Sequence, residues 1–363
     1  MYSCHCGKST TNGLSLTRGS VTQQAISSGE TILDLLTGLW RAGAVKAAME
    51  LDLFTKIAEG RKSSSEIAGA IGASERGTIK LLNALCGLGL LEKRDGRYRV
   101  DPGVETYLSK TSPNYIENLH LGIAAPWEWQ AFGDLAEAVK KGKPTVFKYM
   151  EGQEIQCLEK MVLAIGTLGI ASAERICDVL GIGTKAAQRL EVLDLACGTG
   201  VYGFTIARRV PMSRITSVDR RPILKHAQRL AENMGVADRI SFRPGNIFSL
   251  RYPEDHFDMV LISNVLHQYN RERTLELLRK AHSALRSPEG TIIVHDFIAD
   301  DNRVEATGPL LMSLDMLLYT EDGDVHTQGE YESWLEEAGF ENVTRPFPIR
   351  GNVTAIITAK KSR

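Results

Sequence analysis

Residues 192–200 read Val-Leu-Asp-Leu-Ala-Cys-Gly-Thr-Gly, an apolar run that ends in a glycine turn. The run predicts a buried β-strand, and a predicted helix begins directly after the turn, near Val201. Rossmann-like folds bind a nucleotide at a strand, turn and helix in this order. Gly198 and Gly200 let the backbone bend sharply and approach a ligand closely, while the free N–H groups of the following helix suit a carboxylate or a phosphate.

Two acidic residues indicate which kind of cofactor this turn binds. Asp219 follows Gly200 by about 20 residues, at the end of the next predicted strand, where a carboxylate can accept hydrogen bonds from both ribose hydroxyls. Asp194 lies inside the first strand, near the expected place of a cationic methionyl group, where a pyrophosphate would be repelled. This favours a sulfonium cofactor. Gly198, Gly200 and Gly203 also fit the G-x-G-x-x-G pattern, so NAD or FAD binding and an empty glycine turn stay as alternatives.

From Glu191 onward, predicted strands and helices alternate, which predicts an α/β fold with a parallel sheet. The predicted strands are 192–196, 215–218, 240–242, 259–262, 292–294, one near 343, and 353–358. The helical stretches between them include 222–234 and 273–285. We therefore expect a seven-stranded Rossmann-like domain over residues 186–363.

Residues 29–112 predict a second, smaller domain. Apolar side chains recur at threes and fours from residue 31 to residue 53, as on one face of a helix. Ser63 and Glu66 form a capping box at the start of a short helix, and a second helix starts at Ser74. The tight turn Asp95-Gly96 then joins strands at 90–94 and 97–100. Helix, turn, helix and hairpin in this order predict a winged helix.

Residues 113–185 predict a helical connector with a wide apolar stripe, which is either plain core or one wall of a substrate pocket. The large members of this stripe are Trp127, Trp129, Phe132, Met150, Met161, Leu163 and Ile165. Residues 1–28 are rich in Ser and Thr and are expected to be a disordered tail. Cys4 and Cys6 flank His5, but a structural zinc needs about four ligands, so we expect no metal site.

Composition narrows the classes of partner. The chain has 43 Lys and Arg against 44 Asp and Glu, so no global field attracts nucleic acid or a membrane. A winged-helix DNA-binding regulator is a minor alternative, because the helix from Ser74 offers only Arg76 and Lys80 to phosphates. The first thirty residues lack the apolar core of a signal peptide, and no long uninterrupted apolar window follows. We expect a cytoplasmic protein whose partners are small molecules.

Together these motifs resemble the class I S-adenosylmethionine-dependent methyltransferases, specifically the two-domain O-methyltransferases of plant phenolics and bacterial polyketides. The resemblance covers nearly all of residues 30–360. The first motif of the family, D-x-G-x-G-x-G, aligns with residues 194–200, where Ala196 replaces the first glycine. The resemblance implies S-adenosyl-L-methionine as cofactor and a homodimer formed through the winged-helix domain.

The resemblance also assigns cofactor-binding residues. Asp219 is expected to bind the ribose, while Asn246, Ile247 and Ser263 are expected around the adenine. The full expected set is Asp194, Ala196, Gly198, Gly200, Asp219, Arg220, Asn246, Ile247 and Ser263.

His267 is the candidate general base, because it directly follows the fourth predicted strand of this domain. A phenol with a pKa near about 10 is mostly protonated at neutral pH, and a general base is worth about 10² to 10⁴ in rate. In the resembling family the matching histidine is the base, and an acid at the position of Asp296 orients it. A second orienting acid precedes a Thr-Gln pair, but Val325 and His326 stand there, so one carboxylate is missing. Methylation of carbon or nitrogen by proximity alone, and a cofactor-binding protein that transfers no methyl group, stay open.

The acceptor pocket is expected to include Trp127, Met161, Asn264, Met312 and Met316. The two later methionines lie in a very apolar run, 310–318, for which core or dimer packing is the alternative. The composition of the pocket suggests a flat, largely apolar acceptor of aromatic or polyketide type. His295 should point away from Asp296 by strand alternation, which favours a structural role.

Overall fold

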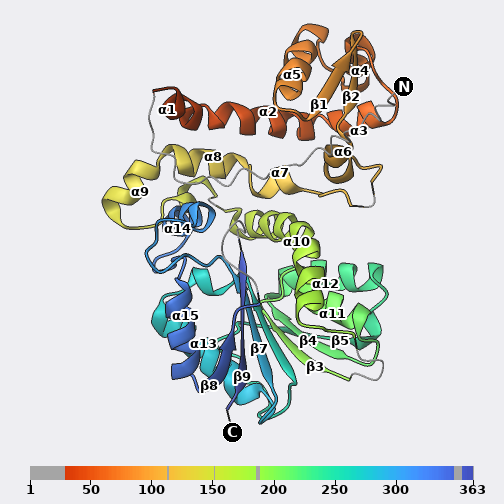
Figure 1. Cartoon of the computed structure of the whole chain (residues 1–363). Coiled ribbons are helices and arrows are strands. Elements are labelled where there is room, and N and C mark those ends of the chain that lie inside the picture. The colour runs from red at the N-terminus through yellow and green to blue at the C-terminus, as the bar shows by residue number, and fades with distance from the viewer. Residues whose placement is uncertain (1–28, 113, 151, 185–188, 347–353, 363) are drawn as a thin grey trace, which may run out of the picture.

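The computed structural model describes residues 29–112, 114–150, 152–184, 189–346 and 354–362. An α/β domain at the C-terminal end carries a layer of helices, and a small mixed unit lies beyond that layer (Figure 1). The expectations for residues 1–28, including Cys4 and Cys6, lie outside the described residues, as does Val353.

The C-terminal domain is built on one seven-stranded sheet of order β5-β4-β3-β6-β7-β9-β8. The first five of these strands run parallel, and β9 is antiparallel to both of its neighbours. The strands are β3 Glu191–Leu195, β4 Arg214–Asp219, β5 Ile240–Pro244, β6 Met259–Ser263, β7 Thr291–Asp296, β8 Phe340–Thr344 and β9 Ala355–Lys361. The predicted α/β class and seven strands are confirmed.

Helices cover both faces of this sheet, because its strands are apolar on both sides. Val192 and Ile215 face α11 and α12, whereas Leu193 and Val218 face α13 and α15. The helices of the domain are α11 Val201–Arg209, α12 Arg221–Asn233, α13 Arg271–Ala284, α14 Thr307–Tyr319 and α15 Gln328–Glu337. Short 3₁₀ turns lie at Ala237–Arg239 (η2) and Leu266–Gln268 (η3).

The N-terminal unit has the predicted winged-helix order. Ser63 caps α4, since its hydroxyl accepts from the backbone N–H of Glu66 and the Glu66 carboxylate accepts from that of Ser63. Asp95 and Gly96 take positive φ values in the hairpin turn. The elements are α1 Gly29–Leu36, α2 Gly38–Glu50, α3 Leu53–Ala58, α4 Ser64–Ile71, α5 Glu75–Gly87, β1 Leu91–Arg94, β2 Arg97–Val100 and α6 Pro102–Leu108.

The helix expected from residue 31 to residue 53 is divided in two. It breaks at Thr37, whose hydroxyl bonds the carbonyl of Asp34 before Gly38 opens α2. No side chain of α1 is buried. Leu36 is 73% exposed and Trp40 is 72% exposed, so none of the residues that the structure describes covers the apolar face predicted for this segment.

The connector is helical, and its last helix lies against the glycine turn. Its elements are α7 Leu119–Gly122, α8 Pro126–Gly133, α9 Leu135–Lys141, the 3₁₀ helix η1 Val146–Tyr149 and α10 Glu154–Val179. A Cβ atom at Gly166 would lie 2.3 Å from Thr199 Oγ1, and one at Gly169 would lie 3.0 Å from Val201 Cγ1. Both glycines thus let α10 approach the turn between β3 and α11.

By length and apolar composition alone, α10 could cross a membrane. No other helix in the described part of the chain is both long and apolar enough to do so. In this fold α10 packs against α7, α11 and α12. Ile165, Leu168 and Ile170 on its outer side are more than one third exposed.

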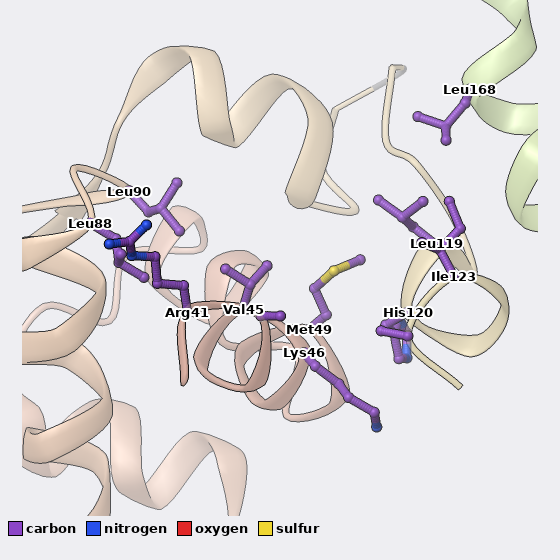
Figure 2. A pocket seen from close by; sticks show the side chains of 12 residues that line it. Arg41, Val45, Lys46, Met49, Leu88, Leu90, Leu119, His120, Ile123 and Leu168 are labelled. Atoms are coloured by element: carbon purple, nitrogen blue, oxygen red, sulfur yellow. The ribbon is translucent and has the colours of Figure 1, made fainter. Parts of the chain in front are cut away.

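An open cavity of about 590 Å³ lies between the N-terminal unit and the connector. Figure 2 shows Val45 and Met49 of α2 facing Leu119 and Ile123 across it, with Leu168 of α10 at its far side. None of the side chains expected to bind cofactor or acceptor lines this cavity.

We predict that Gly166→Ala lowers the free energy of unfolding of the C-terminal domain by about 1 to 3 kcal/mol, because the added methyl group overpacks Thr199. Gly69→Ala is the control, since a Cβ atom there meets nothing within 4 Å. Urea unfolding followed by tryptophan fluorescence measures both variants. Equal stability of the two variants would contradict close packing at the turn.

Candidate active site

Three residues with a left-handed backbone conformation shape the turn after β3. Ala196, Gly198 and Gly200 have φ values of 54°, 58° and 83°. The N–H of Gly198 donates to Asp219 Oδ2 at 2.8 Å, which ties the turn to the end of β4. Because β3 and β4 are adjacent parallel strands, their carboxyl ends meet at one edge, where open sheets bind ligands.

Asp194 lies beneath this turn and is only 1% exposed. Burial, reinforced by the charge of nearby Asp219, raises the pKa of Asp194 to about 7. Among the described residues, none forms a hydrogen bond with Asp194 Oδ2. A hydrogen bond from the backbone of Gly203 lowers the pKa of Asp194 without outweighing burial, so a bound cation would further stabilise the ionised form.

Other buried polar atoms around this edge also lack partners among the described residues. Ser263 Oγ and Asn264 Oδ1 lie at the end of β6, and Thr199 Oγ1 lies in the turn itself. Native folds rarely leave buried polar atoms unpaired unless a ligand or water satisfies them. A cationic sulfonium nucleoside with an amino-acid tail brings the donors and acceptors that these atoms lack, so the residues present fit this cofactor.

Asp219 stands where the ribose is expected. Its two carboxylate oxygens accept the N–H groups of Gly198 and Arg220, at 2.8 and 2.7 Å. Burial raises the pKa of Asp219, and these two backbone bonds oppose that rise. The side chain of Arg220 is exposed at the rim. Each carboxylate oxygen keeps a lone pair for a ribose hydroxyl.

Asn246 and Ile247, the residues expected to contact the adenine, lie just after β5. The side-chain oxygen of Asn246 is bonded within its own loop. The Oδ1 atom of Asn246 accepts the backbone N–H of Phe248 at 2.8 Å, and the Asn246 side chain is otherwise exposed. Ile247 is buried. Asn246 therefore stabilises its own loop, with its amide nitrogen left for a ligand.

His267 and Asp296 form a buried pair. His267 sits on η3 after β6 and is 4% exposed, and its Nδ1 lies 2.5 Å from Asp296 Oδ1 at the end of β7. The carboxylate also accepts the backbone N–H groups of His267 and Phe297 and the hydroxyl of Tyr331. A proton on Nδ1 leaves Nε2 as the free acceptor of the neutral ring.

Opposing effects set the ionisation of Asp296. Burial acts to raise its pKa, but the charge of His267 and the hydrogen bonds from His267 and Phe297 outweigh burial and hold that pKa below its usual value. Asp296 therefore stays a carboxylate at neutral pH and can stabilise a protonated His267.

The missing second acid has no replacement at its family position. Val325 is fully buried, and His326 Nε2 lies 2.9 Å from the carbonyl oxygen of Tyr269. Another acid stands elsewhere: Asp315 on α14, where burial raises the pKa to about 6 and the charge of His267 opposes that rise. The sequence analysis missed Asp315, although a lone carboxylate within the apolar run 310–318 was a usable signal.

The side chains expected to bind the acceptor lie on four segments: α8, α10, α14 and the residue that follows β6. Trp127 on α8 and Met316 on α14 are buried, while Met161 on α10 and Met312 are partly exposed. Asn264, at a φ of 56°, donates from Nδ2 to the hydroxyl of Tyr202 at 3.3 Å.

His295 lies next to this arrangement, since its ring centroid is 5.2 Å from that of Tyr202 and its carbonyl oxygen accepts the backbone N–H of Asn264 at 2.7 Å. Its Nε2 lies 2.9 Å from Thr354 Oγ1, and burial lowers its pKa to about 4, so it stays neutral. Its Nδ1 has no partner among the described residues, and a structural role stays a prediction. In the described part of the chain, no group of three or more His, Cys, Asp or Glu side chains is arranged to hold a metal ion.

Comparison with known proteins gives two family-model matches, an O-methyltransferase domain at residues 132–341 and an O-methyltransferase dimerisation domain at residues 33–110. The chain is 28% identical over 319 residues to the 3-hydroxy-5-methyl-1-naphthoate 3-O-methyltransferase of Streptomyces sahachiroi, covering 86% of this chain and 89% of that protein. It is 29% identical to the tetracenomycin polyketide synthesis 8-O-methyl transferase of Streptomyces glaucescens, covering 91% and 96%. Human N-acetylserotonin methyltransferase, solved in complex with S-adenosylmethionine, shares the fold with a TM-score of 0.80 at 22% identity, over 94% of this chain and 100% of that chain.

We predict that S-adenosylmethionine binds more weakly below about pH 7, by at most about tenfold per pH unit, because a bound cation requires Asp194 to lose its proton. Above that pH Asp194 is already ionised, and its contribution becomes constant. Calorimetry of Asp194→Asn should give weaker binding at pH 8 with a flatter pH dependence. Asp258→Asn, at the opposite end of the sheet, should keep the wild-type profile. The same pH dependence of S-adenosylmethionine affinity in the wild type and in Asp194→Asn would contradict the role assigned to Asp194.

Proposed function

We infer, since the chain belongs to the O-methyltransferase family, that it transfers a methyl group from S-adenosyl-L-methionine to a hydroxyl of a small aromatic or polyketide-like acceptor. The observation that carries this proposal is the buried His267–Asp296 pair at the carboxyl edge of the sheet, beside the glycine turn. A general base and a candidate cofactor crevice are thus at adjacent strand ends.

Bound S-adenosylmethionine supplies an electrophilic methyl group on its sulfonium. Asp219 and the turn at 196–200 hold the nucleoside, with Asp194 beneath the turn. His267 accepts the proton of the acceptor hydroxyl at Nε2, because its Nδ1 proton is held by Asp296. Loss of this proton leaves an electron pair on the acceptor oxygen, to which a bound S-adenosylmethionine would give up its methyl group, its carbon–sulfur bond breaking as S-adenosylhomocysteine leaves. Asp296 stabilises the imidazolium formed at His267.

Tyr331 and Phe297 position this pair. Their hydrogen bonds to Asp296 leave the carboxylate little freedom to rotate away from His267. This support favours O-methylation over transfer to carbon or nitrogen by proximity alone, which needs no oriented base. It also favours catalysis over mere cofactor binding, because a cofactor-binding protein has no use for the pair.

We assign residues 29–112 to dimerisation, 113–185 to the connector and the wall of the acceptor pocket, and 186–363 to cofactor binding and catalysis, with 1–28 as a tail. The acceptor-contacting residues are proposed to be Trp127, Met161, Asn264, Met312 and Met316. Support comes from α14, where Met312 and Met316 lie one turn apart on one face and the charge of His267 opposes the raised pKa of Asp315. We also propose that the protein works in the cytoplasm.

The protein is proposed to be a homodimer. The dimerisation model covers residues 33–110, where Leu35, Leu36, Leu39 and Trp40 are all more than half exposed. The exposed outer side of α10 adds further apolar surface. A second copy that covers these residues would remove them from water.

We predict that His267→Ala lowers kcat by at least about tenfold and up to about 10⁴-fold, because the acceptor loses its base, while the affinity for S-adenosylhomocysteine stays unchanged. Product mass spectrometry follows turnover, and calorimetry follows binding. His256→Ala is the matched control, since His256 is exposed and lies away from the carboxyl edge. Wild-type turnover in His267→Ala would refute the base while leaving the cofactor site intact.

We predict that Leu36→Glu shifts the protein from dimer to monomer, because a charge would be buried at the proposed interface. Sedimentation velocity measures the change. Val139→Glu, at an apolar side chain that is 59% exposed on α9 outside the dimerisation region, should leave the mass unchanged. A wild-type monomer at micromolar concentration would contradict the proposal.

A further inference from the structure

His326 lies just before α15 and is only 5% exposed. Its Nε2 lies 2.9 Å from the carbonyl oxygen of Tyr269. A carbonyl oxygen can only accept, so Nε2 carries the proton and donates it. Tyr269 directly follows η3, the turn that carries His267, so this hydrogen bond holds the far end of that turn.

The backbone of His326 makes a second connection, to the segment that follows Asp296. The carbonyl oxygen of His326 accepts the backbone N–H of Ala299 at 3.0 Å, and the N–H of Gln328 donates to the carbonyl oxygen of Ala299 at 3.2 Å. Asp296 is the last residue of β7, and Ala299 follows it closely in the chain. His326 therefore bonds both the segment that carries His267 and the segment that extends from Asp296.

The imidazole ring of His326 also packs against a side chain that supports Asp296. The ring centroids of His326 and Tyr331 are 5.6 Å apart, and those of His326 and Trp334 are 4.7 Å apart, both edge to face. The hydroxyl of Tyr331 donates to Asp296 Oδ2 at 3.3 Å. Because edge-to-face packing favours one orientation of the rings, His326 limits the movement of Tyr331 as well as that of η3.

The segment that carries His326 is itself held in place. Thr327 and Glu330 form a capping box at the start of α15. Arg303 donates to the carbonyl oxygen of Val325 at 2.7 Å and to Glu330 Oε2 at 3.0 Å. Both chain neighbours of His326 are thus fixed, and its side chain extends from a rigid support.

We propose that His326 is a positioning residue for the proposed base, because it fixes the turn that carries His267 relative to the strand end that carries Asp296. This inference rests on the proposed general-base role of His267. The hydrogen bond between His267 Nδ1 and Asp296 Oδ1 requires both segments to keep their places, since such bonds weaken steeply when their angle is distorted. Without the bond from His326 to Tyr269, η3 gains freedom and the Nδ1 proton of His267 is held less firmly. A smaller share of molecules then offers a free Nε2 to the acceptor hydroxyl.

The test measures the tautomer of His267 by NMR, in the full chain labelled with ¹⁵N-histidine and kept under mildly alkaline conditions. Two-bond proton–nitrogen correlations show which ring nitrogen carries the proton, and His267→Ala identifies the signals of His267. We expect the wild type to hold His267 mainly as the Nδ1–H tautomer, since its partner Asp296 can only accept. This measurement requires neither acceptor nor turnover.

Two substitutions separate the hydrogen bond of His326 from the packing of its ring. His326→Phe keeps an aromatic ring but has no donor, so the Nδ1–H share of His267 should fall to about two thirds or less of its wild-type value. His326→Gln supplies an N–H donor without the ring and should keep that share within about a tenth of the wild-type value. His326→Leu, which is smaller and also lacks a donor, carries the expectation of His326→Phe if that variant does not fold.

His282→Phe is the matched control. His282 also packs edge to face on an aromatic ring, with its centroid 5.1 Å from that of Phe340. It lies toward the end of the sheet opposite to Asp296, because Phe340 pairs with the last residue of β9. The tautomer of His267 should stay as in the wild type in this variant, whatever the change in its melting temperature.

An unchanged Nδ1–H share of His267 in the variants without a donor would overturn the proposal. An equal loss in His326→Gln would also overturn it, because the effect would then belong to the ring. So would a wild type in which His267 is not mainly the Nδ1–H tautomer, since no oriented pair would exist to be held. Failure of the proposed methyl transfer is distinguishable, because it would appear as absent product while the tautomer of His267 still depends on the donor at position 326.

Discussion

The pairing of β3 with β4 on one side and β6 on the other is the constraint on which the site depends. It brings three strand ends to one edge: the glycine turn, Asp219, and the segment that leads to His267. The next pairing, β6 with β7, sets Ser263 opposite His295 and so delivers Asp296 to His267. The glycine turn, Asp219, His267 and Asp296 are separated from one another by about 20 residues or more in the chain. Their approach follows from parallel register, which in turn is fixed by apolar side chains on both faces of each strand.

The second organising element is the layer formed by α8, α10 and α14. Gly166 and Gly169 let α10 rest on the glycine turn, while Trp127 of α8 and Leu318 of α14 join one apolar cluster. The sheet thus carries the proposed catalytic pair, and the helical layer is the proposed wall of the acceptor pocket.

The elements of the sheet and winged helix were predictable because they depend on local signals. Alternating strands and helices, the capping box at Ser63 and the Asp95-Gly96 turn each act within a few residues. The hydrogen bond of His267 to Asp296 was predictable only through the family resemblance. The hydrogen bond from the backbone N–H of Phe248 to Asn246 Oδ1 was not predictable, since it depends on the shape of the loop after β5. The break at Thr37 was missed because the apolar spacing continues across it.

Ala196 shows how a departure from the family motif is tolerated. A left-handed backbone costs an alanine about 1 to 2 kcal/mol more than a glycine, since its Cβ crowds the next carbonyl. The same methyl group restricts the unfolded chain, whose conformational entropy is then smaller by an amount worth about 0.4 to 1 kcal/mol in favour of folding. The gain offsets only part of the cost. The loop therefore keeps its shape at a net cost on the order of 1 kcal/mol to the native state, while the unfolded chain has fewer alternative shapes at this position.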